Sequence, residues 1–219
     1  MKRLLVPFVS LALALVLGGC FEDDVVRPVQ RVPSPDSPTG VVRLFAWCWN
    51  HRDPTRYEKL FTSDFVFVFA AGDSAGNLYR DDPFDRSDML LCARHLFVGD
   101  GGSASPARSI SFVLEDTLHA VADSRPGLDP LRHREIPSAM HLTIVTQDGG
   151  TYEVTGNVTF HVVRGDSAQI PAGLGLAPDS TRWYVDRIED GTLGSTLART
   201  AAPQPTGQTT WGRILRLYL

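Results

Sequence analysis

The chain has 219 residues, with 21 basic and 25 acidic side chains and a formal net charge of −4. This length is enough for one domain of ordinary size together with tails. The basic residues do not gather in the kind of cluster that a nucleic-acid-binding face requires, so the sequence indicates no nucleic-acid partner.

The N-terminal segment has the pattern of a bacterial lipoprotein signal. Met1–Arg3 is positively charged, Leu4–Leu17 is apolar, and Leu17–Cys20 reads Leu-Gly-Gly-Cys, a small-residue cleavage site that ends in a cysteine. The apolar run has about fourteen residues, fewer than the roughly 20 that a membrane-spanning helix needs. We therefore expect residues 1–19 to be a signal peptide and Cys20 to carry the lipid.

A lipidated Cys20 predicts where the protein is found. Acyl chains bind a bilayer with about 0.8 kcal/mol per buried methylene, so the membrane is an expected partner through the lipid anchor. Phe21 follows the cysteine, at a position where an aspartate often keeps lipoproteins at the inner membrane. The expected location is the cell envelope, at the outer membrane facing the periplasm, with the cell surface as the alternative.

Composition divides the rest of the chain into three parts. Residues 20–37 contain several prolines and little apolar periodicity, which is typical of an extended tether. Residues 38–199 are the expected domain, and residues 200–219 are a linker followed by an apolar tail. We expect the tail to pack on its own domain, because burying its apolar surface recovers about 25 cal/mol per Å² without a partner.

Three helices are expected in the first half of the domain. Ser37-Pro38 and Asp53-Pro54 each place an N-cap before a proline at the first helical position, and Asp85 or Ser87 caps the third helix. The first helix carries an apolar stripe at helical spacing, made of Val41, Leu44, Phe45, Cys48 and Trp49.

Strands are expected at 64–69, 109–122, 140–146, 151–164 and 182–188, and the first of them is apolar on both faces. A loop with Pro126, Pro130 and Pro137 separates the second and third strands. At the Asp148-Gly149-Gly150 turn, a three-residue loop pairs even-numbered residues with each other and collects the apolar ones on one face. A shift of one residue would break up this face, so burial predicts the three-residue loop. His141 and His161 then face outward.

The order of two capped helices, a strand, a third helix and four strands resembles the nuclear-transport-factor-2-like superfamily. The similarity lies in residues 40–67, 88–97 and 182–190, and Trp183 fits the tryptophan that begins the strand closing the sheet. The resemblance implies an α+β fold in which three N-terminal helices pack on a curved, mainly antiparallel sheet that forms a cone. Members include isomerases, dehydratases and binding proteins without catalysis, so the resemblance leaves the activity open.

Enzymes with this fold use acid–base groups inside the cone, and Asp116 is the carboxylate that fits. Counting by twos from Ile110 places Asp116 on the apolar face, where desolvation would suit a general base, with Tyr57 or His95 as its partner. A β-bulge that turns Asp116 outward is the alternative. An apolar ligand in the cone would meet Trp47, Tyr57, Phe67, His95, Phe160 and Trp183, although a plain core needs no ligand.

Cys48 and Cys92 are candidates for a disulfide in an oxidising compartment, with two buried free thiols as the alternative. The histidines lack the spacing of metal-ligand motifs, and no phosphate loop or dinucleotide fingerprint occurs, so we expect neither a metal site nor a cofactor. The favoured hypothesis is a lipid-anchored, non-enzymatic envelope domain that binds a small apolar ligand or a protein partner. The alternatives are an isomerase- or dehydratase-type enzyme with Asp116 as base, and a structural protein that assembles through its tail.

Overall fold

The computed structural model describes residues 31–71, 73, 79, 83–165, 179, 181–192 and 206–219, without the side chains of 206–208. The predicted signal peptide, Cys20 and most of the tether lie outside these residues. None of the helices among the described residues combines the length and the hydropathy needed to cross a membrane.

Among the described residues, the structure has the three predicted helices, each beginning at a predicted cap, and a fourth helix that the sequence did not predict. They are α1 (Pro38–His51), α2 (Pro54–Tyr57), α3 (Arg86–Val98) and α4 (Trp211–Leu217). Ser37, Asp53 and Asp85 cap the first three, and each cap oxygen accepts a backbone N–H of the first turn that has no partner within the helix. The fourth helix is formed by the apolar tail, and Thr210 caps it.

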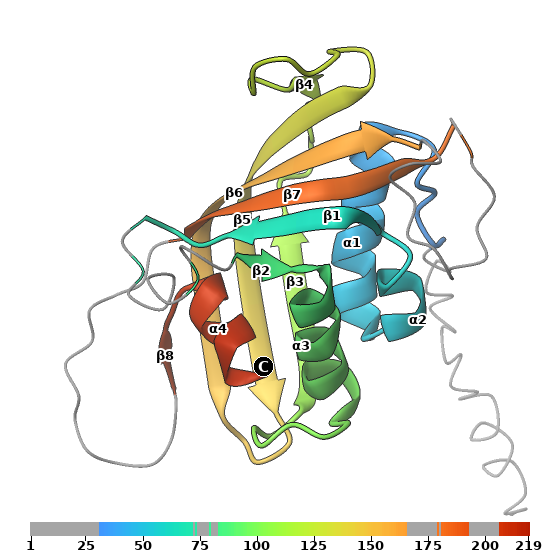
Figure 1. Ribbon diagram of the computed structural model, residues 1–219. Helices are drawn as coiled ribbons and strands as arrows, with labels where there is room; N and C mark the ends of the chain where they lie inside the picture. The colour runs from blue at the N-terminus through green and yellow to red at the C-terminus, as the bar shows by residue number, and fades with distance from the viewer. Residues whose placement is uncertain are drawn as a thin grey trace, which may run out of the picture. The chain divides into compact units, whose positions relative to one another are not determined.

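The strands form one curved sheet. They are β1 (Phe61–Val68), β2 (Phe84–Asp85), β3 (Ala107–Leu114), β4 (Val121–Ala122), β5 (His133–Thr146), β6 (Thr151–Arg164), β7 (Trp183–Thr192) and β8 (Thr206–Gln208). Their order is β2-β1-β7-β6-β5-β3, with β4 paired to β5 and β8 to β6; the β1–β7 and β6–β8 pairs are parallel. Helices α1, α3 and α4 lie on one side of this sheet (Figure 1). The predicted α+β fold class, with helices on a curved and mainly antiparallel sheet, is confirmed.

The register of the long β5–β6 hairpin is the one that burial predicts. Leu142 pairs with Val154 and Ile144 with Tyr152, so even-numbered residues face each other. The Thr146 N–H donates to the Gly150 carbonyl at 2.9 Å and closes a three-residue loop. Gly149 takes a φ of 91°, which an L side chain rarely adopts.

Two predicted boundaries around β5 are wrong. The strand expected at 109–122 ends at Leu114, and Pro137 lies inside β5 instead of in a loop. On the side of β5 that faces β3 and β4, pairing with β3 ends at Met140 and pairing with β4 begins at Glu135. Pro137 therefore stands where that side of the strand has no ladder partner, and its missing N–H costs little.

The domain also extends beyond its predicted limits. At the N-terminal end, the Trp183 N–H donates to the Pro35 carbonyl at 2.8 Å, so the last residues of the predicted tether pack on the sheet. At the C-terminal end, part of the predicted linker forms β8, which pairs with the beginning of β6. The tail that follows is therefore held close to the sheet before α4 begins.

Candidate functional site

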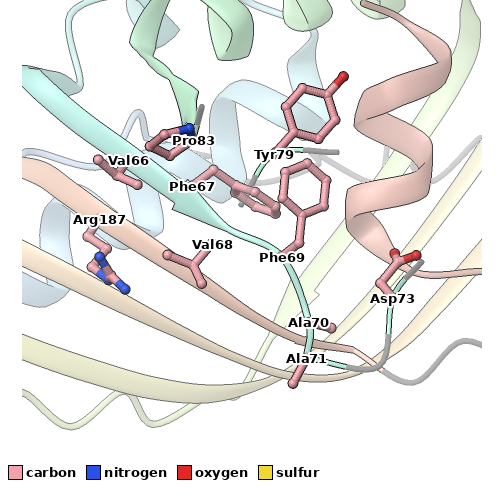
Figure 2. A pocket seen from close by; sticks show the side chains of 10 residues that line it. All are labelled: Val66, Phe67, Val68, Phe69, Ala70, Ala71, Asp73, Tyr79, Pro83 and Arg187. Carbon is pink, nitrogen blue, oxygen red and sulfur yellow. The ribbon is translucent and has the colours of Figure 1, made fainter. Parts of the chain in front are cut away.

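A cavity of about 440 Å³ opens beside the last residues of β1 (Figure 2). Its walls are mainly apolar. Val66 and Val68 line it from β1, together with Phe69 and Tyr79, whose nearly parallel rings have centroids 5.0 Å apart. Aromatic and branched side chains around a space of this size are typical of sites for small molecules, which commonly measure about 300–1,000 Å³.

Two charged side chains border this cavity. Arg187 is half-buried and donates through Nε to Glu189 at 2.7 Å, while the Asp73 carboxylate is fully buried. Asp73 accepts hydrogen bonds from the Thr210 hydroxyl and from Arg213 Nε, and Figure 2 shows it beside the start of α4. In the part of the chain that the structure describes, the cavity therefore combines an apolar wall with a partly accessible cation, Arg187.

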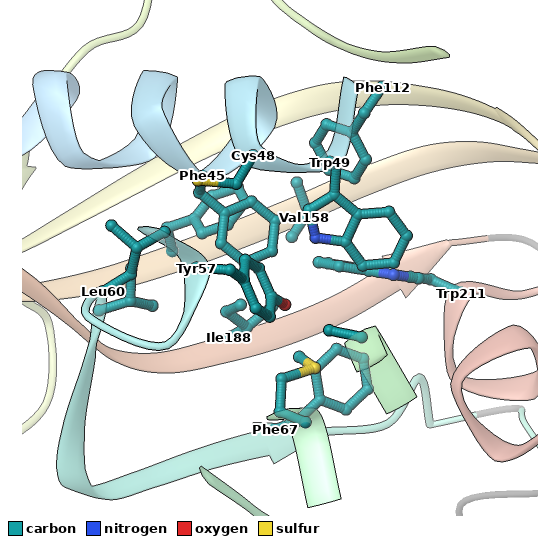
Figure 3. Close-up of a cluster of buried hydrophobic side chains, with 14 of the residues drawn as sticks. Phe45, Cys48, Trp49, Tyr57, Leu60, Phe67, Phe112, Val158, Ile188 and Trp211 are labelled. Carbon is teal, nitrogen blue, oxygen red and sulfur yellow. The ribbon is translucent and has the colours of Figure 1, made fainter. Parts of the chain in front are cut away.

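The interior of the cone is filled by the protein's own side chains (Figure 3). Trp211 of α4 lies at its centre, with ring centroids 5.3 Å from Phe67, 5.6 Å from Phe112, 5.7 Å from Trp49 and 5.9 Å from Phe45. All five side chains are almost completely buried. The space where a ligand was expected is thus occupied by the C-terminal helix, and the predicted packing of the tail on its own domain is confirmed.

Hydrogen bonds from α3 hold the end of α4 in place. Cys92 Sγ donates to the Leu215 carbonyl at 3.0 Å, and His95 Nδ1 lies 2.6 Å from the Tyr218 carbonyl. The Tyr218 hydroxyl donates to the Ser105 carbonyl at 2.7 Å. The bond from His95 satisfies the carbonyl of Tyr218, the residue that ends the helix, and the Leu215 carbonyl accepts Cys92 Sγ in addition to the Tyr218 N–H at 3.1 Å.

The beginning of α4 rests on a buried carboxylate of β7. Asp190 accepts the Gly212 N–H at 3.0 Å and two hydrogen bonds from Thr192, and the Thr192 hydroxyl in turn accepts the Trp211 N–H at 3.1 Å. Burial raises the pKa of Asp190, although the hydrogen bonds from Thr192 and Gly212 oppose this. A side chain at Gly212 would collide with the Phe69 ring, so a glycine is needed for this close approach.

The residues predicted to bind a ligand in the cone therefore have other roles. Tyr57, Phe67, Phe160 and Trp183 are buried in the core, and His95 binds the end of α4. Trp47 is only partly buried at the edge of the core and stacks on His51 with centroids 3.9 Å apart. Of these six residues only Phe67 also lines the cavity beside β1.

The structure does not support Asp116 as a buried base. Because β3 ends at Leu114, the count by twos no longer applies, and Asp116 is exposed. Its backbone carbonyl accepts a hydrogen bond from Arg43 at 2.9 Å.

The predicted disulfide is also absent, since Cys48 and Cys92 are both free and buried. Burial raises the pKa of each thiol to about 12, so neither is ionised at neutral pH. The alternative of two buried free thiols is the correct one.

His161 was expected to face outward into solvent. The register does place it on the outer face of β6, but only 3% of the residue is exposed, because residues that follow β4 cover it. Its ring lies 2.9 Å from the Asp123 carboxylate. The sequence could not show this cover, because β4 and its loop are packed by tertiary contacts and not by a local pattern.

The residues of the cavity beside β1 were also missed, although a signal was present. A strand with one face on the core normally alternates between apolar and polar residues. In β1, Val66 and Val68 are apolar although they do not face the core. Apolar residues on both faces of β1 are therefore the sequence feature that indicates the cavity.

No protein-family model and no curated protein matches this sequence. Similar solved structures include a conserved protein from Planctomyces limnophilus, which is 14% identical and aligns over 71% of this chain and 92% of its own, with a TM-score of 0.46. A nuclear transport factor 2-like superfamily protein from Salmonella enterica is 15% identical over 77% of this chain and 94% of its own, with a TM-score of 0.44. AusH from Aspergillus nidulans is 9% identical and aligns over 79% of this chain and 93% of its own, with a TM-score of 0.46.

These likenesses concern the fold, and no function is taken from them. In the described residues, α1 and α3 lie on one side of a curved mixed sheet, which is the α+β arrangement that the sequence resemblance implies. The additional helix α4 lies on the same side of that sheet and inserts Trp211 into the core.

Proposed function

We propose that this chain is a lipid-anchored, non-enzymatic domain of the cell envelope that binds a small apolar ligand in the cavity beside β1. The observation that carries this proposal is the position of Trp211, which fills the interior of the cone. Because the interior is filled, binding is expected at the cavity of about 440 Å³, whose walls are apolar and aromatic.

The arrangement of buried acids argues against the enzymatic alternative. Asp116 is exposed, and among the described residues the acids buried near the core, Asp73 and Asp190, are engaged in holding α4. A general base must reach a proton on its substrate, and these carboxylates already accept hydrogen bonds from the protein. The tail-mediated assembly is likewise disfavoured, because the tail is packed on its own domain.

Binding can be tested with an apolar fluorescent probe, 1-anilinonaphthalene-8-sulfonate. We expect the native protein to bind it at one saturable site, and V68D to bind it at least tenfold more weakly, because the charge enters the apolar wall. V113D is the matched control, since Val113 is a half-exposed valine on β3 outside the cavity. Equal probe binding by the wild type, V68D and V113D would overturn the assignment of this cavity.

The anchor is tested separately by fractionation of cells. C20A should leave an unprocessed or soluble protein, because the apolar run before it is too short to span a bilayer. Wild-type protein should remain with the membranes after a high-salt wash. Recovery of C20A in the washed membranes would contradict the lipid anchor while leaving the ligand site untouched.

A further inference from the structure

The outer face of the sheet carries a group of three potential metal ligands. Asp123 follows β4, Glu135 lies on β5 and His161 lies on β6, and each offers a ligand atom within 4.8 Å of the other two. We call these three residues the outer-face triad. Glu135 and His161 are directly paired across β5 and β6, so a rigid backbone holds two of the three positions.

The His161 ring lies between two carboxylates. Nδ1 is 2.9 Å from Asp123 Oδ2, and Nε2 is 3.6 Å from Glu189 Oε1 and is buried without a hydrogen-bond partner. A neutral imidazole carries one proton, so one ring nitrogen must turn a lone pair toward a carboxylate. An additional cation at this position, either a second proton or a metal ion, satisfies both nitrogens.

The charges around the triad also favour a cation. The four carboxylates are Asp123, Glu135, Asp186 and Glu189, and they face two guanidinium groups, Arg125 and Arg187. With a neutral His161 these groups sum to −2. Arg125 binds Asp123 and Asp186, but a carboxylate has about four lone-pair sites and can accept both an arginine and a metal ion.

Glu135 completes the ligand set of the triad. Glu135 Oε2 accepts hydrogen bonds from the Ser124 N–H and hydroxyl, at 3.1 and 2.8 Å, which orient its carboxylate within the triad. Two carboxylate oxygens and one imidazole nitrogen form a ligand set that suits first-row divalent transition metals better than Mg²⁺ or Ca²⁺.

We propose that the outer-face triad is a binding site for a divalent transition-metal ion of the zinc or manganese type. His161 Nδ1, Asp123 and Glu135 bind the ion, and His161 Nε2–H faces Glu189. A carboxylate on the second ring nitrogen is the usual arrangement behind a metal-binding histidine, where it fixes the tautomer. The proposal does not depend on the ligand cavity beside β1.

The test uses the full-length protein in detergent, stripped of metal with a chelator and titrated with Zn²⁺ by calorimetry. We expect one ion per chain, with binding weakened on the order of 10- to 100-fold or more in H161Q and in E135Q. Zn²⁺ should also raise the thermal midpoint of the wild type but not of these variants. H119Q is the matched control, because His119 is an exposed histidine outside the triad, and it should bind as the wild type does.

Two results would overturn the proposal. One is no saturable Zn²⁺ or Mn²⁺ binding by the stripped wild type, together with a His161 ring that carries two protons in nitrogen NMR spectra, which would make the cation a proton. The other is Zn²⁺ binding that H119Q weakens as much as H161Q does. If H161Q fails to fold, E135Q decides the matter, because glutamine retains an oxygen that can accept the Ser124 hydrogen bonds.

Discussion

The two faces of the sheet, built from the same strands, differ in how they use alternate residues. The inner face meets α1, α3 and α4 and is closed by aromatic rings around Trp211. The outer face carries a row of paired residues that crosses four strands, from Val66 through Arg187 and His161 to Glu135. This row begins at an apolar cavity and ends at a charged cluster. The inner face is packed against the helices, and the outer face carries the residues to which the two proposals assign binding.

Each face also contains a buried aspartate, and the two have opposite pKa shifts. Burial raises the pKa of Asp190, which is inside, and the hydrogen bonds from Thr192 and Gly212 do not fully offset it. Burial also acts on Asp123, on the outer face, but hydrogen bonds from the Arg125 side chain and backbone outweigh it and hold the pKa of Asp123 well below its usual range. Neighbouring charged groups therefore set the direction of the pKa shift of Asp123, and desolvation sets that of Asp190.

The largest expected effect comes from removing the ring at the centre of the inner face. W211A should lower the free energy of unfolding by about 3–5 kcal/mol, because a large buried side chain is replaced by a cavity. Urea denaturation measures this change. W47A is the control, since Trp47 is only partly buried at the edge of the core, between His51 and Arg56, and it should lower the free energy of unfolding by less than about 1.5 kcal/mol. Equal costs for the two variants would show that Trp211 is not a core residue.

The two aspartates predict opposite dependences on pH. Asp123 stabilises the fold above about pH 5 and loses this contribution as the pH falls below the ordinary carboxyl pKa of about 3.9. D123N should therefore lower the free energy of unfolding more at pH 7 than at pH 3, by about 1–3 kcal/mol. The stabilisation from Asp190 is complete below about pH 4 and is lost as the pH rises through the raised pKa of this carboxyl. D190N should therefore lower the free energy of unfolding less at pH 7 than at pH 4.

The measurement is urea denaturation of the wild type, D123N and D190N between pH 3 and pH 7. Other titrating groups cancel when each variant is compared with the wild type at the same pH. For each variant, the loss of unfolding free energy relative to the wild type is plotted against pH. Slopes of the same sign for D123N and D190N would contradict the conclusion that desolvation dominates at Asp190 and charge pairing at Asp123.

The smallest expected effect is on the reactivity of thiols on the two faces, measured by maleimide labelling of the folded protein. Cys48 and Cys92 are buried, and burial raises the pKa of each thiol to about 12, so neither should react with a maleimide in the native protein at pH 8. V68C places a thiol at the cavity beside β1, and this thiol should react readily. Labelling of Cys92 as fast as V68C would mean that the inner face opens on the timescale of the reaction.

Local patterns in the sequence were enough to predict the first three helices and the main hairpin, but not that the tail forms the helix α4. Ser37 and Asp53 are caps because their side chains bond to nearby backbone, which depends only on neighbouring residues. The β5–β6 register followed from burial, because a shift of one residue would expose Leu142 and Ile144.

The features that the sequence did not reveal depend on contacts between distant segments. Asp116 was misplaced because nothing local marks the end of β3 at Leu114. The outer-face triad could not be seen, because Asp123, Glu135 and His161 have no metal-motif spacing and meet only when β4, β5 and β6 pair. The tail was predicted to dock from its apolar content, but the position of Trp211 at the centre of the core required the structure.

The central claim is that α4 is a permanent part of the inner face, and amide hydrogen exchange of the native protein tests it most directly. The Trp211 and Gly212 N–H groups donate to buried acceptors on Thr192 and Asp190. They should therefore exchange as slowly as the central amides of β6, such as that of Val158, through global unfolding. Exchange of the Trp211 and Gly212 amides within seconds, while that of Val158 remains protected, would show that α4 leaves the core readily and would contradict the account.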